Sequence, residues 1–393
     1  MCKENEGNKI VKTNSDFLFI YEGTRTNPNG DPDMENKPRM DYDTKTNLVT
    51  DLRIKRNIRE YLKDSGDEIF VDTLEENKVT VEVKLNSIIK NVLDNEAEFE
   101  KIIKGNEKIS KKWKEFIQNL KKDMNKDKDN EKEKKPERTF EEKYPTNKEI
   151  YDLIKTKAKD KNFKSIQEKE FNSFNNHLLE TIIKNNLIDI RMFGGAFAVE
   201  GFSRTYTGAI QLNWGYSLHP VELIKSDTIV TIMNEDASTF GKDYRLYYSL
   251  IAFHGTINKH LADKNGLTND DVKKFRDSII SSVFYKPTRS KSDQYPIFYL
   301  EIEYNENYNC YLRDLRDFIK CEKKDSSKTI RSLNDLEIDL SDLSQLIKNN
   351  QPKIKQIHIW KTPLSETDFD VFEKSINDGV KKKFEICSIK IKE

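Results

Sequence analysis

The apolar positions near the start of the chain predict a strand followed by a helix. The run SDFLFIYEG (residues 15–23) is apolar at five of its nine positions and polar at both ends, which is typical of a buried strand. A helix is predicted over VTDLRIKRNIREYLKDSG (residues 49–66), where Thr50 can cap the start and Gly66 can end it. Its apolar side chains recur at helical spacing and form one stripe, made of Ile54, Ile58, Tyr61 and Leu62.

The middle of the chain is highly charged and predicts helices. The alternation in NKVTVEVKL (residues 77–85) predicts one more strand, after which residues 86–186 have a helical pattern. Within them, residues 121–138 contain eight basic and six acidic residues. Burial cannot offset the entropy of ordering so polar a segment, and we expect a mobile linker there. Further helices are predicted to start at Thr146 and Asn172.

Glycines, aromatic residues and strand-forming residues replace the charged pattern after residue 187. A helix with a capping box formed by Thr268 and Asp271 is predicted over residues 268–285, and a basic loop follows at 286–294. The other predicted elements are strands at 227–234, 244–258, 295–304, 353–360 and 382–391 and a helix at 365–378. Strands interleaved with few helices favour an α+β fold, in which an antiparallel sheet has helices packed on one face.

The composition constrains the size of the core and the cellular setting. Charged and hydrophobic residues each make up 35% of the 393 residues, so the core is smaller than the length suggests. Lys and Arg total 68, as do Asp and Glu, so the net charge is zero. This does not exclude a nucleic-acid partner, because binding depends on where basic residues cluster and not on the net charge. We see no signal peptide or membrane span and expect a soluble protein. Reduced thiols are expected at the scattered cysteines Cys2, Cys310, Cys321 and Cys387.

The long loop GTRTNPNGDPDMENKPRMD (residues 23–41) raises the question of a metal site. Oxygen-bearing side chains alternate along it, but the EF-hand spacing fails because Gly30 is the fourth residue counted from Asn27 and not the sixth. Asn-Pro and Asn-Gly pairs supply turn chemistry instead. We predict no metal and no other cofactor. The alternating side chains are Asn27, Asn29, Asp31, Asp33 and Glu35.

Basic residues in this loop and in the helix after it are candidates for anion binding. Cations beside an apolar stripe also occur on ordinary solvated helices, but long loops inside compact domains are usually functional or disordered. Arginine suits bidentate contacts with phosphate. The candidate cations are Arg25 and Arg39 in the loop and Arg53, Lys55, Arg56, Arg59 and Lys63 in the helix.

Motifs for nucleotide binding and hydrolysis are missing from the sequence. The glycine pair in DIRMFGG (residues 189–195) permits close backbone approach, but neither a Walker sequence nor GxGxxG surrounds it. The histidines lack HExxH spacing, and no GxSxG is present. His219 lies in a loop dense with candidates, yet a packing role is the simpler interpretation. We therefore predict no catalytic residue.

Blocks of sequence taken in order resemble one known family. They are YEGTRTNPNGDPDMENKPRMDYDTKTNLVTDLRIKRNIREYL, DIRMFGGAF, TGAIQLNWGYSLHPV, FGKDYRLYYSLIAFHGTIN and TRSKSDQYPIFYLEIEY. The set resembles the backbone subunit of type I CRISPR surveillance complexes (Cascade), in the subtype I-B and I-C branch. This is the seventh numbered Cas family, in the repeat-associated superfamily with an RRM-like core. The resemblance covers about residues 16–86 and 187–305.

The resemblance implies a fold likened to a right hand. An RRM-like (ferredoxin-like) palm with an antiparallel sheet would comprise residues 1–66 and 187–393. Helical fingers would be inserted at 67–186, including the mobile linker at 121–138, and a β-hairpin thumb would lie at about 221–243.

The implied function is non-enzymatic and cytoplasmic. Copies of the subunit would polymerise along a CRISPR guide RNA and present it for pairing with target DNA in antiviral defence. The implied partners are the guide RNA, target DNA, further copies of the chain and other Cascade subunits, with no membrane. Two alternatives remain open: metal-dependent RNA cleavage as in type III complexes, using Asp31, Asp33 or Asp41, and RNA binding without polymerisation.

The resemblance and the charge pattern together imply the RNA contacts. Cations would face phosphates, and the glycine pair would let RNA lie against the backbone. The sequence has no RNP-type aromatic signature, so we expect low sequence selectivity. The predicted RNA-binding residues are Arg25, Asn27, Arg39, Arg53, Lys55, Arg56, Arg59, Arg191, Phe193, Gly194, Gly195, Gln211, Arg245, Arg289 and Lys291.

Overall fold

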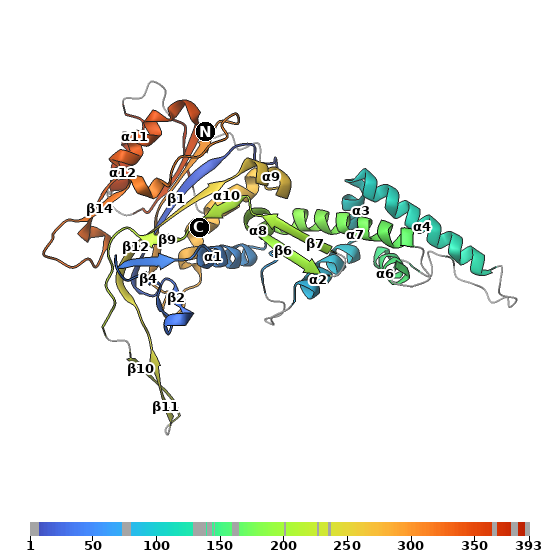
Figure 1. The fold of residues 1–393 in the computed structure, drawn as a ribbon, viewed down its shortest axis with the longest axis horizontal. Helices are drawn as coiled ribbons and strands as arrows, with labels where there is room; N and C mark the ends of the chain where they lie inside the picture. Colours follow the sequence, from blue (N-terminus) through green and yellow to red (C-terminus); the bar gives the residue numbers. More distant parts are fainter. Residues whose placement is uncertain are drawn as a thin grey trace. The chain divides into compact units, whose positions relative to one another are not determined.

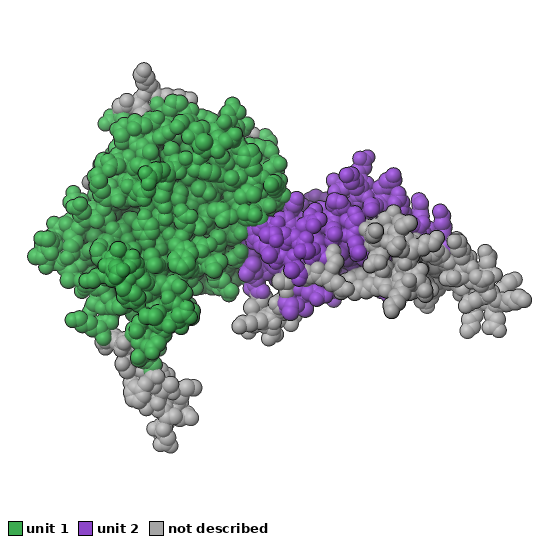
Figure 2. All heavy atoms as spheres, viewed as in Figure 1, with its two compact units in different colours: residues 1–67, 191–193, 207–393 green, residues 68–190, 194–206 purple. Residues whose placement is uncertain are grey.

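The computed structural model divides the chain into two compact units (Figure 2). Unit 1 comprises residues 1–67, 191–193 and 207–393, and unit 2 comprises residues 68–190 and 194–206. Residues 194–206 therefore group with unit 2, whereas the sequence analysis assigned them to the palm. The structure describes residues 8–72, 80–128, 139, 144, 146–158, 165–199, 202–225, 228–234, 237–363, 368–378 and 384–389.

Unit 1 is built on a nine-stranded sheet around β1 (Ser15–Thr26) (Figure 1). β1 pairs antiparallel with β12 (Leu246–Ile257) and with β13 (Gln294–Tyr304). Beyond β13 lie β16 (Ile354–Lys361) and β17 (Ile386–Ser388); beyond β12 lie β8 (Ile210–Leu212), β9 (Gly215–Ser217), β5 (Thr46–Val49) and β4 (Met40–Asp41). Among the described strands only β16 and β17 pair in parallel, and the α+β class is confirmed.

Helices cover both faces of this sheet. On one face α10 (Asn269–Tyr285) packs beside α1 (Asp51–Asp64), and the ring of Phe17 contacts Phe275. On the other face lie α11 (Ser341–Asn349) and α12 (Asp368–Ser375), where the ring of Phe298 stacks on Phe369. The prediction of helices on one face is therefore wrong. The run FLFIY is apolar at successive positions because alternate side chains enter two different cores.

The long loop between β1 and α1 is folded into two small hairpins. β2 (Gly30–Asp31) pairs with β3 (Lys37–Pro38) around the 3-10 helix η1 (Pro32–Met34). β4 pairs with β5, which joins the main sheet through β9. The remaining elements of unit 1 are α9 (Lys259–Asn265), the hairpin of β10 (Thr228–Asn234) and β11 (Ala237–Lys242), the hairpin of β14 (Lys320–Lys323) and β15 (Leu336–Asp339), and the 3-10 helices η2 (Leu315–Phe318), η3 (Leu333–Asp335) and η4 (Gln351–Lys353).

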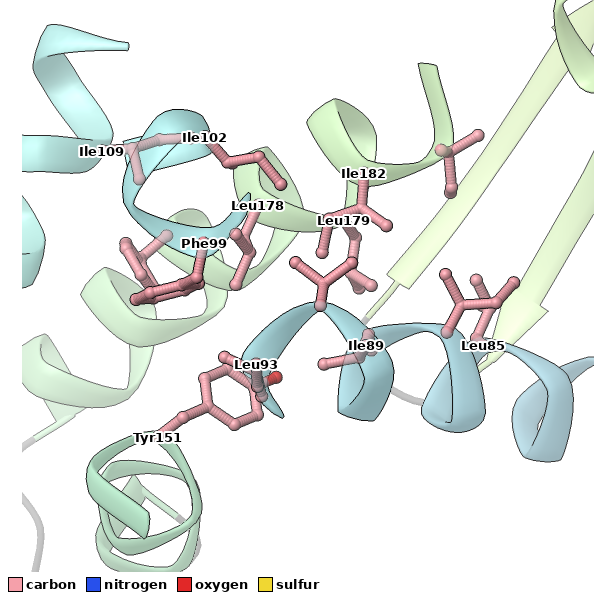
Figure 3. Packing of buried hydrophobic residues seen from close by; sticks show 14 of the residues in the cluster. Leu85, Ile89, Leu93, Phe99, Ile102, Ile109, Tyr151, Leu178, Leu179 and Ile182 are labelled. Atoms are coloured by element: carbon pink, nitrogen blue, oxygen red, sulfur yellow. The ribbon is translucent and has the colours of Figure 1, made fainter. Parts of the chain in front are cut away.

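Unit 2 is mainly helical and has its own apolar core (Figure 3). Its helices are α2 (Val81–Asp94), α3 (Glu96–Lys104), α4 (Glu107–Lys128), α6 (Asn147–Ala158) and α7 (Ser165–Asn186), and a hairpin of β6 (Gly194–Val199) and β7 (Phe202–Thr207) follows. Helix α8 (Ile188–Phe193) lies at the division between the units. Phe99, Leu178 and Ile182 are almost completely buried in the core, as the helical pattern of residues 86–186 predicted.

Three predictions in the charged middle are wrong. Residues 81–85 of the strand predicted at 77–85 are the start of α2, which Thr80 caps by accepting a hydrogen bond from the backbone N–H of Val83, while 77–79 lie outside the described residues. Residues 121–128 of the expected linker are the last part of α4, while 129–138 lie outside the described residues. Asn172 lies inside α7, whereas Thr146 caps α6 as expected.

Cys310 and Cys321 are free thiols, as expected, and Cys2 lies outside the described residues. In the described part of the chain, no helix has the length and hydropathy needed to cross a membrane.

Candidate nucleic-acid interface

Arg53 and Lys291 form a pair of half-buried cations near the end of β1. Arg53 lies on α1 and Lys291 lies in the basic loop before β13; neither side chain forms an ion pair with another described residue. Burial lowers the pKa of both, and the charge of Arg53 lowers the pKa of Lys291 further. An anion between them would remove this penalty. Arg56, on the same helix, is exposed and bonds to Glu60.

Backbone carbonyls hold the basic loop against the end of β1. The hydroxyl of Thr26 and the backbone N–H of Asn27 both donate to the carbonyl oxygen of Ser290 at 2.7 Å. The side-chain amide of Gln294 donates to the carbonyl oxygen of Lys291 at 3.3 Å. Thr26, Ser290 and Gln294 were not predicted, because the sequence around an uncharged polar loop residue does not indicate its hydrogen-bond partner.

The same region contains the N-terminus of α1. The side-chain oxygen of Asn29 accepts hydrogen bonds from the backbone N–H of Thr50 at 3.1 Å and from its hydroxyl at 2.9 Å. Thr50 in turn accepts from the backbone N–H of Arg53. A helix N-terminus carries partial positive charge, which adds to the attraction that the cations exert on an anion.

A second group of cations shares the carboxylate of Asp243. Arg245 donates to it through Nη2 at 2.7 Å, and Arg289 approaches it through Nε at 3.8 Å. The hydrogen bond from Arg245 lowers the pKa of Asp243. Arg245 also donates to the carbonyl oxygen of Arg25 at 3.2 Å. One carboxylate thus serves two guanidinium groups, which leaves positive charge beside β1. Asp243 was not predicted.

Lys55 and Arg59 face the interior of unit 1. Both are 8% exposed, and their cations lie over the ring of Phe193, at 5.8 Å and 5.3 Å from its centroid. The Nζ atom of Lys55 also bonds to Asp51 at 2.8 Å. These cations fix α1 on Phe193 through cation–π contacts, whereas Arg53 projects from a more open part of the helix.

Two further predicted residues bond within unit 1. Arg191 forms a bidentate ion pair with Asp271, with both nitrogen–oxygen distances at 2.8 Å. Gln211 is exposed and donates to the carbonyl oxygen of Gly208 at 2.8 Å. The structure therefore gives Arg191 a structural partner, while Gln211 remains accessible.

The glycines around Phe193 differ in backbone conformation and in the room that each leaves for a Cβ atom. Gly194 has φ +75°, which favours glycine, and ends α8. A Cβ atom on Gly195 would lie 2.7 Å from the side chain of Ile190. The tightest backbone approach is at Gly208, where a Cβ atom would lie 2.3 Å from the carbonyl carbon of Phe193. Gly208 was not among the predicted residues.

The substitution Gly208→Ala is expected to lower the free energy of unfolding by about 1–3 kcal/mol, the usual effect of overpacking. The added methyl group meets backbone, which cannot rotate away as a side chain can. Urea denaturation measures the effect. An unchanged midpoint would contradict the close packing of Gly208 on Phe193.

Several polar side chains of the opening loop bond to groups within the loop or in the turn after it. Asn27 is 2% exposed and donates to the carbonyl oxygen of Asn36 at 2.8 Å. Arg39 pairs with Asp31 at 3.2 Å. Asp41 accepts from backbone N–H groups of the turn that follows it. Among the described residues, no three His, Cys, Asp or Glu side chains are grouped so that they could hold a metal ion.

The sheet with two helical layers and the cations grouped beside β1 define an α+β protein with a candidate surface for a polyanion. The chain belongs to the family of CRISPR-associated protein Cas7, whose model matches residues 13–341. A relative from Haloferax volcanii, named CRISPR-associated protein Cas7, is 24% identical over 353 residues, which cover 88% of this chain and 86% of the relative.

Two chains from solved structures align with most of this chain. One belongs to a structure titled CRISPR RNA-guided surveillance complex, pre-nicking, with a TM-score of 0.48 and 12% identity over 93% of this chain and 99% of the other. The second belongs to a structure titled CRISPR RNA-guided surveillance complex, with a TM-score of 0.42 and 10% identity over 90% and 93%.

Proposed function

We propose that this chain is a guide-RNA-binding backbone subunit of a subtype I-B-like Cascade complex that acts in the cytoplasm. Copies of the chain would line up along one CRISPR RNA with other Cascade subunits and leave its bases free to pair with target DNA. Membership in the Cas7 family supports this proposal. The observation that carries it is the half-buried pair Arg53 and Lys291, which has like charges and forms no ion pair with a described carboxylate, since the nearby Glu60 bonds to Arg56.

The chemistry of this pair favours a phosphate group. Arginine offers a planar fork to phosphate oxygens, and a lysine ammonium adds a point charge. Arg25, Arg245 and Arg289 extend the positive charge along the same end of β1. Phosphate contacts fix the position of a nucleic acid without reading its sequence, as a subunit that serves any guide requires.

An RRM-like palm is supported by the order of elements in unit 1. In a ferredoxin-like fold two split β-α-β units interlock, and the strands lie in the order fourth, first, third, second. The strands β13, β1, β12 and β9 lie in this order, and α1 and α10 follow β1 and β12 in sequence. The helices of unit 2 are our candidate fingers, and the β10–β11 hairpin is our candidate thumb.

The sheet itself offers no platform for bases. An RRM that reads sequence stacks bases on aromatic side chains of its open sheet face. Here that face is covered by α11 and α12, and Phe298 is fully buried against Phe369. We therefore place RNA along the cation-lined end of the sheet, where backbone contacts dominate.

We also propose that the chain does not cleave RNA. Asp31 is paired with Arg39, and Asp41 bonds to backbone N–H groups, so both carboxylates have partners that shape the loop. Complementary RNA incubated with the guide-loaded chain and Mg²⁺ is expected to stay intact. Periodic cuts that disappear in Asp31→Ala, Asp33→Ala or Asp41→Ala would favour the type III alternative.

A length series of RNA tests assembly. The chain mixed with single-stranded RNAs of increasing length is expected to form particles whose protein mass rises in steps of 46.2 kDa, measured by mass photometry. RNAs of equal length and different sequence should give the same particles. One chain bound to the longest RNA would contradict polymerisation and favour a single RNA-binding module.

A further inference from the structure

Asp16 and His254 face one another in the core of unit 1. Asp16 on β1 is fully buried, and His254 on β12 is 5% exposed. The Nε2 atom of His254 lies 3.7 Å from the Oδ1 atom of Asp16. Among the described residues, neither Oδ1 of Asp16 nor Nδ1 of His254 has a hydrogen-bond partner. A carboxyl oxygen with unused bonding capacity thus lies opposite a buried imidazole.

The second carboxyl oxygen of Asp16 connects β1 to the segment 305–319, which links β13 to β14. The hydroxyl of Tyr304 and the backbone N–H of Leu312 both donate to Oδ2, the latter at 2.8 Å. Arg316 of the same segment donates to a carbonyl oxygen of β12 at 3.2 Å. The strength of the hydrogen bonds that hold this segment on the sheet therefore depends on whether Asp16 is charged.

The surroundings of the pair favour uncharged groups. Burial raises the pKa of Asp16 to about 7, and the nearby carboxylate of Asp314 contributes to the rise. Burial lowers the pKa of His254 and outweighs the opposing effects of Asp314, Asp317 and a hydrogen bond to the backbone of Phe17. The titratable and charged groups that face the pair are Tyr304 on β13 and Tyr311, Asp314, Arg316 and Asp317 in the 305–319 segment.

We propose that Asp16 and His254 share one proton, which sits on the Asp16 carboxyl group in the folded chain and on the His254 imidazole in the unfolded chain. On folding, the imidazolium gives up one N–H bond and an O–H bond forms on the Asp16 carboxyl group. Between pH 3.8 and 6.5, where unfolded His is protonated and unfolded Asp is ionised, no net proton enters or leaves the protein. The pair is neutral in the core and charged in water, so the core never holds an ion pair.

The pH dependence follows from the two pKa shifts. The pKa of Asp16 is raised above 3.8, so this group alone makes the folded state less stable as pH rises from 3.8 to about 7. The pKa of His254 is lowered below 6.5, so this group alone makes the folded state less stable as pH falls below 6.5. The two effects oppose each other just below pH 6.5 and cancel, because both states of the pair hold one proton.

Removing either member should expose the effect of the other. In His254→Gln, the unfolding equilibrium constant relative to that of the unaltered chain should rise about tenfold per pH unit as pH approaches 6.5 from below. In Asp16→Asn, the same ratio should fall about tenfold per pH unit up to about pH 7. Urea denaturation at several pH values measures both. Ratios that do not change with pH would overturn the shared proton.

Infrared spectroscopy reports the proton directly and needs only the unaltered chain. A protonated carboxyl band is expected at about pH 6, where free carboxyl groups are ionised. Asp16→Asn should remove the Asp16 component of this band, while the partly buried Glu22 and Glu68, whose pKa values burial also raises, are unchanged in both proteins. In Tyr304→Phe the Asp16 component should persist to higher pH, because the hydrogen bond from Tyr304 stabilises the carboxylate. Absence of the band from the unaltered chain would mean an ion pair and would overturn the proposal.

Discussion

Replacing Arg53 and Lys291 together with alanine is expected to weaken RNA binding by about one to three orders of magnitude and to leave the fold intact. A charge-assisted contact contributes on the order of 1–2 kcal/mol, and about 1.4 kcal/mol corresponds to a factor of ten in affinity. The change also relieves the repulsion that lowers the pKa of Lys291, so the free energy of unfolding should not fall.

Fluorescence anisotropy with a labelled single-stranded RNA at several salt concentrations tests this. The slope of log affinity against log salt should become shallower by about 0.7 for each lost phosphate contact. The matched control is Arg313→Ala with Lys328→Ala, which removes two cations of unit 1 that are 82% and 73% exposed. Equal losses in both double variants would mean that binding is diffuse and that the Arg53–Lys291 site is wrong.

The sequence predicted helix α1 but could not separate its cations by role. The spacing of Ile54 and Ile58 defines a buried stripe, and both residues are buried as expected. Lys55 and Arg59 directly follow them and flank the stripe, so their long side chains can reach either solvent or the interior. Both cations lie over the ring of Phe193, which is distant in the sequence, and this contact keeps them in the interior. Spacing within one helix contains no information about that contact.

Elements were predicted correctly where local pattern and tertiary packing agree. β1 and α10 combine strong local signals with full burial, and the capping box of Thr268 and Asp271 is present. The error at residues 77–85 has a physical cause, because a short alternating run fits a strand and the first turn of a helix equally well. Leu85, Ile89 and Val92 recur at helical spacing and are buried in the core of unit 2. This burial is possible for a helix and stabilises it over a strand.

The candidate site was less predictable than the fold because it is made of loops. The basic loop at 286–294 was recognised by its charge, but its contact with β1 depends on hydrogen bonds to the carbonyl oxygen of Ser290. Every residue has a backbone carbonyl, so a sequence cannot show which one accepts a bond. The proximity of Arg53 to Lys291 follows from that contact, and no periodicity could have indicated it.

The substitution Asp271→Ala is expected to lower the free energy of unfolding by about 3–5 kcal/mol, because it leaves the guanidinium of Arg191 without its carboxylate. Asp271 is 4% exposed, and the side chain of Arg191 is 12% exposed. The same change removes the hydrogen bond that Asp271 accepts from the backbone N–H of Thr268, a helix-capping contribution of about 1 kcal/mol. Thermal and urea denaturation measure the loss.

Two further variants separate the ion pair from the cap. Asp270→Ala changes an exposed residue in the same first turn of α10 and should cost less than about 1 kcal/mol. The double variant Arg191→Leu with Asp271→Ala removes both charges, so part of the stability lost in Asp271→Ala should return. If the double variant is less stable than Asp271→Ala, the guanidinium of Arg191 has another stabilising role. If the Asp270 and Asp271 variants lose equal stability, the pair with Arg191 does not hold α8 to α10.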